Sequence, residues 1–412
     1  MLHTRGRLRQ HHGVTAGIYL HIPFCRIRCP YCDFNTYTGM TDRIPSYVDA
    51  LILELELRCA QESVRTDQTI TSVYFGGGTP SLLDPAQVER ILGAISARFP
   101  VANDLEVTLE ANPGTVDRSK LRAFAAAGVT RLTLGVQTFN PTLLSQLGRL
   151  HSVSESLAAI ADAEACAFDS INIDLMYGLS GQSEADWASD LTRALAQPVS
   201  HLSLYNLTIE EDTPFARFES EGRIVLPDED ICRAMYLAVL EATEAAGFAR
   251  YEVSNFAASG AECRHNRLYW DGASWLGLGA GAHGFTAEQG SWGRRWWNLK
   301  RPGPYIATVR DGRLPEDSSE ELDQGQAADE ALMLGLRRSE GLDLDQFERR
   351  FGIGLMAWTD TALDSAVADG LLHHNGGHLV ASKDGVIIVD YLVCLLAASL
   401  DRRAGWDRLG RC

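Results

Sequence analysis

Six short apolar runs, rich in β-branched residues, alternate with longer amphipathic stretches through the first half of the chain. The runs occupy residues 18–24, 72–78, 106–113, 131–139, 171–179 and 201–209, and helical patterns between them include 46–59, 85–99, 117–128 and 183–197. Strands and helices that alternate in this way form parallel βα units, which build either a barrel or a doubly wound sheet.

The positions of polar and glycine residues favour the barrel. At or near the carboxyl ends of the predicted strands lie Cys25, the glycines 76–78, Glu110, Gln137, Asp174 and Tyr205. In a parallel barrel these strand ends face one mouth, where functional groups gather. The sequence therefore predicts an α/β fold built on a partial (β/α)6 barrel.

The alternation ends after residue 218, and the rest of the chain follows other patterns. Residues 228–248 form one long helical pattern, a stretch rich in Gly, Trp and Tyr follows, and a smaller helical module contains a predicted hairpin at Gly376 and Gly377. We expect a flexible tail at 1–17, the barrel at 18–250, the aromatic-rich segment at 251–319, a mainly helical, winged-helix-like module at 320–402 and a tail at 403–412.

Charge and cysteine usage restrict the class of protein. The formal net charge of -17 argues against a nucleic-acid binder, which needs a basic surface. The nine cysteines are odd in number and only three cluster, which suits a reducing compartment. The apolar run at 385–400 is too short to span a bilayer and contains Asp390. We expect a cytoplasmic protein with at most peripheral membrane contact.

Three cysteines in a CxxxCxxC pattern follow the first predicted strand, at Cys25, Cys29 and Cys32. They could be three unrelated thiols. A structural zinc site usually has four protein ligands, and no further cysteine or histidine pair is evident. Three soft thiolates on a loop favour an iron–sulfur cluster, in which one iron of a [4Fe–4S] cube stays open for another ligand.

A CxxxCxxC loop after the first strand of a βα barrel resembles the signature of the radical S-adenosylmethionine (SAM) superfamily. The glycine-rich segment "YFGGGTPSLL" at 74–83 is similar to that family's SAM-binding strand end. The resemblance implies a [4Fe–4S] cluster whose open iron is chelated by SAM. It also implies a one-electron donor if SAM is cleaved to a 5′-deoxyadenosyl radical.

Segments throughout residues 18–305 more closely resemble oxygen-independent coproporphyrinogen III oxidase, and the C-terminal module resembles it more loosely. This resemblance implies roles for individual residues around SAM. Two tyrosines would border the cluster and the adenosine, a glycine–threonine run would hold the methionine end, and charged and amide groups would bind the ammonium, carboxylate and ribose. In that order these residues are Tyr19 and Tyr31; Gly77, Gly78 and Thr79; Glu110; Arg149; and Gln137 with Asp174.

Two features separate this chain from the oxidase branch. The oxidase resemblance implies a further cysteine two positions after Cys32, where this chain has Phe34. The chain instead has an HNxxYW motif, which resembles the HemW-type heme chaperones and implies heme at its histidine. The motif residues are His265, Asn266, Tyr269 and Trp270, and the surrounding segment, 251–319, is the expected heme-site segment.

Other readings of the aromatic-rich segment stay open. It could be packing, and His265 could be a hydrogen-bonded structural residue. Further heme-ligand candidates are Cys263, His283, His373, His374 and His378.

The resemblance implies a heme chaperone that binds heme and transfers it to acceptor hemoproteins, such as respiratory ones. The alternatives are a radical SAM coproporphyrinogen III oxidase, or a radical SAM enzyme with another tetrapyrrole or an unrelated substrate. No catalytic residue is assigned, and whether the chain is an enzyme stays open.

Overall fold

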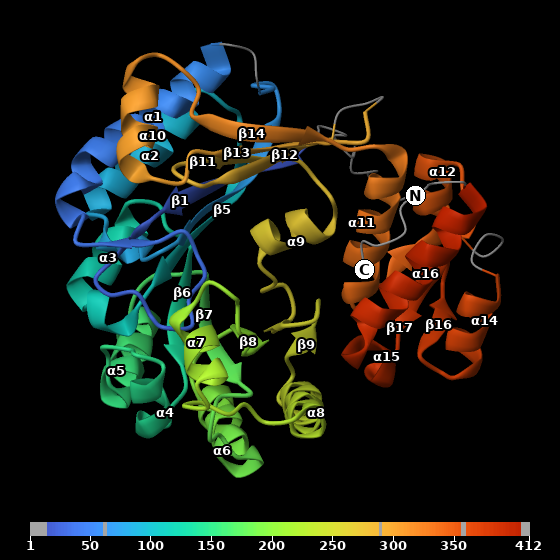
Figure 1. Cartoon of the computed structure of the whole chain (residues 1–412). Coiled ribbons are helices and arrows are strands. Elements are labelled where there is room, and N and C mark those ends of the chain that lie inside the picture. Colours follow the sequence, from blue (N-terminus) through green and yellow to red (C-terminus); the bar gives the residue numbers. More distant parts are fainter. Residues whose placement is uncertain (1–14, 61–63, 288–290, 356–359, 405–412) are drawn as a thin grey trace, which may run out of the picture.

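The core of the protein is one open, curved sheet (Figure 1). The computed structural model describes residues 15–60, 64–287, 291–355 and 360–404. At the centre of the sheet, six parallel strands stand in sequence order and confirm the partial (β/α)6 barrel. They are β1 (Thr15–Ile22), β4 (Thr69–Gly77), β5 (Val101–Ala111), β6 (Arg131–Gln137), β7 (Ser170–Tyr177) and β8 (His201–Asn206).

Helices follow the parallel strands and cover the outer face of the sheet (Figure 1). Every residue of β6 is buried, as expected for a parallel strand with both faces covered. The helices are α1 (Ile44–Ala60), α2 (Pro85–Ser96), α3 (Arg118–Ala126), α4 (Pro141–Gln146), α5 (Val153–Glu164), α6 (Glu184–Leu195), α7 (Pro214–Ser220) and α8 (Glu229–Ala245). Short strands β2 (Phe24–Cys25), β3 (Tyr37–Thr38), β9 (Ala249–Arg250) and β10 (Asn255–Ala257) complete this half.

The aromatic-rich segment adds four strands to the β1 edge, which the sequence did not predict. We call them the sheet extension: β11 (Trp275–Leu278), β12 (His283–Thr286), β13 (Arg294–Asn298) and β14 (Glu316–Glu321). β11 runs parallel to β1, and the other three continue antiparallel. Glycines interrupt their apolar pattern because neighbours lie close: a Cβ on Gly284 would lie 2.1 Å from the Trp296 indole. The helix α10 (Pro302–Arg310) connects β13 to β14.

Two predicted boundaries fall inside strands. β1 begins at Thr15, within the predicted tail, and β14 crosses from residue 319 into the predicted helical module. β14 has the sequence EDSSEE, which lacks an apolar face, and only its pairing with β13 identifies it as a strand. Residues 1–14 and 405–412 of the predicted tails lie outside the described residues, and α16 extends to Ala404, past the predicted boundary at 402.

The helix α9 (Arg264–Trp270), which carries the HNxxYW motif, lies on the concave side of the sheet (Figure 1). Gly17 on β1 makes this contact possible. A Cβ at position 17 would lie 2.6 Å from Leu268 Cδ1 and 2.9 Å from His265 Nδ1. The motif is therefore part of the inner layer of the barrel.

The C-terminal module combines helices with a small antiparallel sheet, as predicted. Its elements are α11 (Gln324–Arg337), β15 (Leu342–Asp343), α12 (Leu344–Phe351), α14 (Asp360–Ala368), β16 (Leu372–Asn375), β17 (His378–Ala381), α15 (Lys383–Ile387) and α16 (Val389–Ala404). Gly376 and Gly377 join β16 to β17 with positive φ angles of 56° and 87°, as a two-residue type I′ turn requires.

The apolar run at 385–400 fills the core of this module, where Val389, Leu392, Leu396 and Leu400 are buried. Among the described residues, no helix is both long and apolar enough to cross a membrane.

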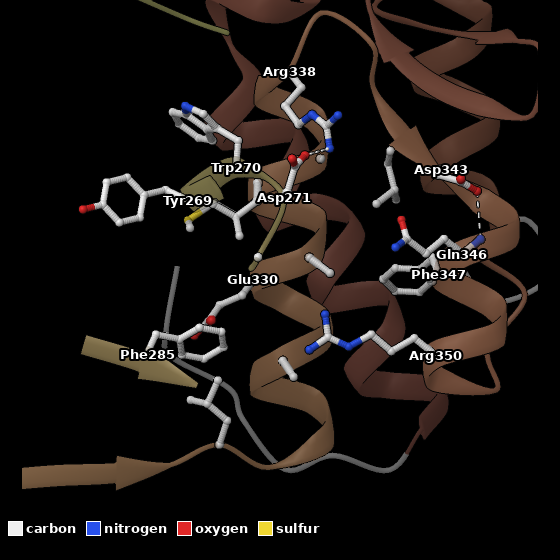
Figure 2. Close-up of a pocket in the computed structure, with 18 of the residues that line it drawn as sticks. Tyr269, Trp270, Asp271, Phe285, Glu330, Arg338, Asp343, Gln346, Phe347 and Arg350 are labelled. Atoms are coloured by element: carbon white, nitrogen blue, oxygen red, sulfur yellow. Dashed lines mark hydrogen bonds and ion pairs between the residues drawn. The ribbon is translucent and has the colours of Figure 1, made fainter. Parts of the chain in front are cut away.

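A cavity of about 770 Å³, here called the lateral cavity, lies between α9, the sheet extension and the helices α11 and α12 of the C-terminal module (Figure 2).

A buried polar cluster ties the sheet extension to the outer helices. The Glu54 carboxylate on α1 accepts hydrogen bonds from Arg58 Nε (2.9 Å), Asn298 Nδ2 (2.8 Å), Tyr305 OH (2.7 Å) and Gly279 N (2.9 Å). Glu54 and Arg58 are 0% and 1% exposed. Each of the two oxygens of this buried carboxylate therefore accepts two hydrogen bonds, and together these bonds connect α1, α10, β13 and the end of β11.

Replacing Glu54 by Ala should destabilise the protein by about 3–5 kcal/mol, because the buried Arg58 guanidinium loses one of the two carboxylate partners that it has among the described residues and keeps Glu316, 3.0 Å away. Chemical denaturation measures the loss. The matched control is Asp49→Ala, which breaks the exposed Arg90–Asp49 ion pair of 2.7 Å and should cost less than about 1 kcal/mol. Equal losses in the two variants would contradict the assigned role of the cluster.

Candidate functional site

A cavity of about 410 Å³, here called the strand-end cavity, lies at the carboxyl ends of the parallel strands. The structure brings together nearly all residues that the sequence predicted for the cluster and SAM. Those that line the cavity are Cys25, Cys29, Tyr31, Cys32, Gly77, Gly78, Thr79, Glu110, Gln137, Arg149 and Asp174.

Cys25 ends the short strand β2, Cys29 and Cys32 lie on the loop that follows it, and each of the three is partly exposed. The Thr79 hydroxyl donates to Cys25 Sγ over 3.5 Å, and Arg149 Nη1 donates to Cys29 Sγ over 3.7 Å. Burial raises the pKa of both Cys25 and Cys32 above the usual value for a thiol. Among the described residues, no group of three or more His, Cys, Asp or Glu side chains is placed so that it could hold a single metal ion.

Gly77 and Gly78 form the edge of the cavity beside Cys25. Gly77 has φ of +107°, which a residue with a side chain rarely adopts. A Cβ on Gly78 would lie 2.8 Å from the carbonyl oxygens of Ile22 and Phe24, and 3.1 Å from Cys25 Sγ. The backbone at Gly78 can therefore lie against the segment that carries Cys25 only because this residue has no side chain.

Two buried carboxyl groups line the cavity from β5 and β7, the strands on either side of β6. Burial raises the pKa of Glu110 to about 7, although Tyr74 OH (2.8 Å) and Gly77 N (3.2 Å) donate hydrogen bonds to it. Burial also raises the pKa of Asp174 to about 6, although Asn172 donates a hydrogen bond to it. Carboxyl groups held in this way favour a cationic or hydroxyl-bearing partner in the cavity.

Arg149 provides positive charge to the same cavity. Its Nη2 donates to Gly135 O over 2.8 Å and to Asn112 Oδ1, and its Nη1 donates to Tyr31 OH over 3.4 Å. The Nε atom of Arg149 is buried and has no hydrogen-bond partner among the described residues. The guanidinium group thus retains donor capacity for an anion such as a carboxylate.

Gln137 ends β6 with φ of +71°, the only positive φ of a non-glycine residue in the described parts of the chain. Strained backbone of this kind is concentrated at functional sites. Its placement at the cavity agrees with the predicted ribose contact, which stays a prediction.

Tyr19 is the one predicted SAM residue that does not line the strand-end cavity. It points to the concave side of β1, where its ring stacks on Tyr74 with centroids 6.1 Å apart and its hydroxyl contacts His21 Nδ1 over 3.1 Å. Residues with odd numbers on β1 face the barrel interior, so Tyr19 lies one layer beneath the cavity rather than at its surface.

Sequence reasoning missed Asn112 and Tyr74. Asn112 contacts Arg149 and donates to Thr79 Oγ1 over 3.1 Å. Asn112 follows directly after the end of β5. A polar residue at the carboxyl end of a parallel strand is the signal that could have identified it. Tyr74 lies in mid-strand, so its contact with Glu110 required knowledge of which face of β4 turns inward.

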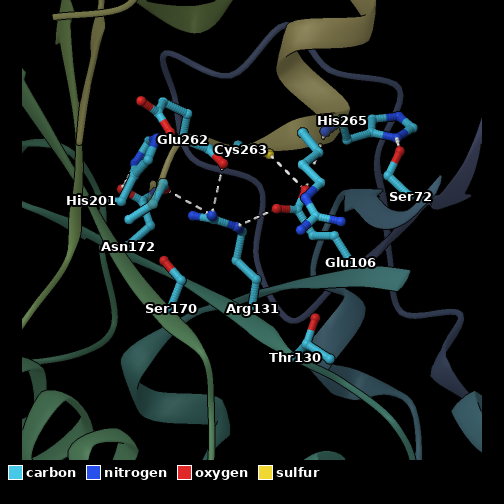
Figure 3. Close-up of polar contacts among 12 residues, drawn as sticks. Ser72, Glu106, Thr130, Arg131, Ser170, Asn172, His201, Glu262, Cys263 and His265 are labelled. Atoms are coloured by element: carbon cyan, nitrogen blue, oxygen red, sulfur yellow. Dashed lines mark hydrogen bonds and ion pairs between the residues drawn. The ribbon is translucent and has the colours of Figure 1, made fainter. Parts of the chain in front are cut away.

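Beneath Tyr74, the HNxxYW segment is anchored by a buried ion pair between Glu106 and Arg131 (Figure 3). The two side chains lie 3.0 Å apart, and each is less than a tenth exposed. Arg131 Nη2 donates to the carbonyl groups of Ala261 and Glu262 over 2.8 and 3.0 Å, while Glu106 Oε1 accepts from His265 N over 3.1 Å. Charged groups from β5 and β6 therefore bind the backbone at the start of α9.

His265 is fully buried, and both of its ring nitrogens are hydrogen-bonded. Nδ1 contacts Ser72 Oγ over 2.8 Å, as Figure 3 shows, and Nε2 contacts Tyr269 OH over 3.0 Å. Burial lowers the pKa of this imidazole to about 3, so the ring is neutral. Asn266 lies at a small polar pocket within the barrel, whereas Tyr269 and Trp270 line the lateral cavity.

The fold and the strand-end cavity define a radical SAM protein. The family model described as "Radical SAM superfamily" matches residues 19–194, and that of the "HemN C-terminal domain" matches residues 322–388. In structure the chain is similar to coproporphyrinogen III oxidase (HemN) from Escherichia coli, with a TM-score of 0.77 and 21% identity over 93% of this chain and 90% of that one. That similarity supports the fold.

In sequence the chain is 38% identical over 387 residues to "Heme chaperone HemW" of Mycobacterium tuberculosis, which covers 92% of this chain and 94% of that protein. It is 32% identical to the Bacillus subtilis protein of the same name, over 90% and 96%. The chain belongs to the HemW family of the radical SAM superfamily.

In the protein without SAM, replacing Glu110 by Gln should raise stability. The raised pKa makes the ionised carboxylate costlier in the folded chain than in the unfolded one, so the penalty is absent below the usual pKa and complete above about pH 7. The gain should grow between about pH 5 and pH 8, to about 2–3 kcal/mol. Thermal unfolding across this pH range measures it.

The same variant should bind SAM more weakly, which titration calorimetry of the cluster-loaded protein measures. A gain in stability that does not change with pH would contradict the assignment, as would unchanged SAM affinity.

Proposed function

We propose that this protein is a heme chaperone that binds heme and transfers it to acceptor hemoproteins. It carries a [4Fe–4S] cluster on three cysteines with SAM at the open iron. The observation that carries the proposal is the similarity over at least nine tenths of the chain to proteins named heme chaperones. The arrangement of the strand-end cavity supports the part that concerns the cluster and SAM.

The residues of the strand-end cavity suit these two groups. Cys25, Cys29 and Cys32 would hold three irons, and the space beside Gly77 and Gly78 would admit the methionine end of SAM. The unpartnered Nε of Arg149 suits the SAM carboxylate, and Glu110 suits its amino group. When bound and reduced, the cluster supplies one electron that can cleave SAM, which requires an external one-electron donor.

The HNxxYW segment supports heme binding, and the structure adds a condition to the predicted role of His265. Because both ring nitrogens are hydrogen-bonded and the side chain is 0% exposed, direct ligation of iron would require a change at α9. The assignment of His265 as iron ligand stays a prediction.

The alternative function is oxygen-independent coproporphyrinogen III oxidation, which the shared fold and the complete strand-end cavity favour. Phe34 argues against it. This residue lines the strand-end cavity and is 61% exposed, at the position where resemblance to the oxidase implies a further cysteine. A phenyl ring offers no ligand or proton donor there.

Anaerobic reconstitution with iron and sulfide, followed by addition of SAM and a reductant, separates these functions. We expect stoichiometric heme uptake, seen as a Soret band, and no conversion of coproporphyrinogen to protoporphyrinogen. Transfer is tested by mixing heme-loaded protein with an apo-hemoprotein and following the acceptor's spectrum. Turnover of coproporphyrinogen would contradict the chaperone assignment, and so would absence of heme uptake.

Replacing Cys29 by Ala should abolish the broad visible absorbance of the cluster, because a three-thiolate site has no spare ligand. The matched control is Cys166→Ala, since Cys166 lies outside the strand-end cavity and contacts Arg118 O through its thiol over 3.8 Å. An unchanged spectrum in Cys29→Ala would refute cluster ligation by this residue.

A further inference from the structure

We propose that heme binds in the lateral cavity, with the imidazole of His283 as its iron ligand and the guanidinium of Arg350 at a propionate. This inference rests on the proposed function, and it places the heme outside the radical SAM strand-end cavity.

The size and position of the lateral cavity suit a porphyrin. Its volume of about 770 Å³ lies within the roughly 300–1,000 Å³ typical of small-molecule and cofactor sites. Tyr269 and Trp270 of the HNxxYW motif line it, so the motif contributes to the site through its aromatic residues. Figure 2 shows these residues on one side of the cavity, with Phe347 and Arg350 of α12 on the other.

Aromatic rings stand on both sides of the cavity. On the sheet extension, Trp275 and Phe285 lie with centroids 5.2 Å apart, and Trp275 packs edge-on against Tyr269 at 4.8 Å. On the side of the module, Phe351 stacks on Trp292 at 5.7 Å with an interplanar angle of 15°. A flat conjugated ligand can be sandwiched between such walls, because offset and edge-on ring contacts are favourable.

The charged groups around the cavity leave Arg350 available for an anion. Arg295 pairs with Glu330, and Arg338 pairs with Asp271 at 2.8 Å and with Glu340. Asp343 caps α12 by accepting from Gln346 N over 2.8 Å. Arg350 has no ion pair among the described residues.

The contacts of Arg350 are weak ones. It lies over the Phe351 ring at 5.0 Å, and its Nη2 donates to Trp292 O over a long 3.5 Å. Figure 2 shows its side chain reaching from α12 toward α11. Glu330 acts on this guanidinium only through its charge and pairs with Arg295, so a heme propionate would be a direct carboxylate partner for Arg350.

Of the histidines near the cavity, His283 is the one in which neither ring nitrogen makes a hydrogen bond to the described residues. It is exposed, lies on the same face of β12 as Phe285, and makes no ring hydrogen bond to the described residues. Its ring stacks on Trp297 with centroids 5.9 Å apart, which restrains its orientation. By contrast, His265 is buried with both nitrogens engaged, and His378 Nδ1 contacts Gly376 O over 3.4 Å.

The first test compares hemin binding to the wild-type chain and to His283→Ala by absorbance and electron paramagnetic resonance. We expect His283→Ala to weaken binding by roughly tenfold or more and to lose the spectrum of an imidazole-ligated iron. Added free imidazole should restore that spectrum, which a purely structural role of His283 would not produce. His374→Ala, at an exposed histidine on β16, is the matched control and should bind as wild type.

The second test fills the cavity without touching a ligand. Ala331 on α11 lines the lateral cavity and is partly buried. Ala331→Trp should weaken hemin binding by roughly tenfold or more while thermal stability and the cluster spectrum stay unchanged. Arg350→Gln should weaken binding of hemin more than binding of its dimethyl ester, because the ester has no ionised propionate.

The outcomes separate the two proposals. Absence of hemin binding by the wild-type chain would overturn the proposed function together with this inference. Wild-type-like binding by both His283→Ala and Ala331→Trp would overturn the lateral cavity as the heme site and leave the proposed function standing.

Discussion

The buried ion pair between Glu106 and Arg131 determines where the helix α9 packs inside the barrel. Its charges lie inside the barrel and are neutralised by each other and by the backbone at the start of α9. A buried pair that lost one partner would leave an uncompensated charge, so the pair and the helix require each other. Because α9 is fixed on the concave face, the strand-end cavity and the lateral cavity are separate spaces. Tyr74, His265 and Tyr269 connect them through contacts between neighbouring side chains.

The central fold was predictable because short apolar runs alternate regularly with longer amphipathic stretches. The sheet extension was not, because its strands are short, rich in glycine and tryptophan, or, as in β14, wholly polar. Their pairing depends on side chains distant in sequence, above all Glu54, which binds Asn298 and Tyr305 across more than two hundred residues. A local sequence pattern does not predict contacts between residues so far apart in the chain.

The strand-end cavity was predicted more completely than the surroundings of the HNxxYW motif, for a physical reason. Parallel strands place their carboxyl ends at one edge, so motif residues such as Gly78 and Asp174 meet there once the strands are known. Tyr19 does not line this cavity, because its position on β1 points its side chain into the barrel, where it stacks on Tyr74. His265 illustrates the limit: its spacing in HNxxYW identifies the family, whereas its two hydrogen bonds depend on Ser72 and on the depth at which α9 lies.

The depth at which α9 lies in the barrel depends on Gly17, because this residue has no side chain. With only a hydrogen atom at this position, the side chains of Leu268 and His265 can pack directly on the backbone of β1. The helix α9 therefore packs as close to β1 as a residue without a side chain permits. Its position is encoded by the absence of a methyl group, on a strand that contributes no motif residue at that point.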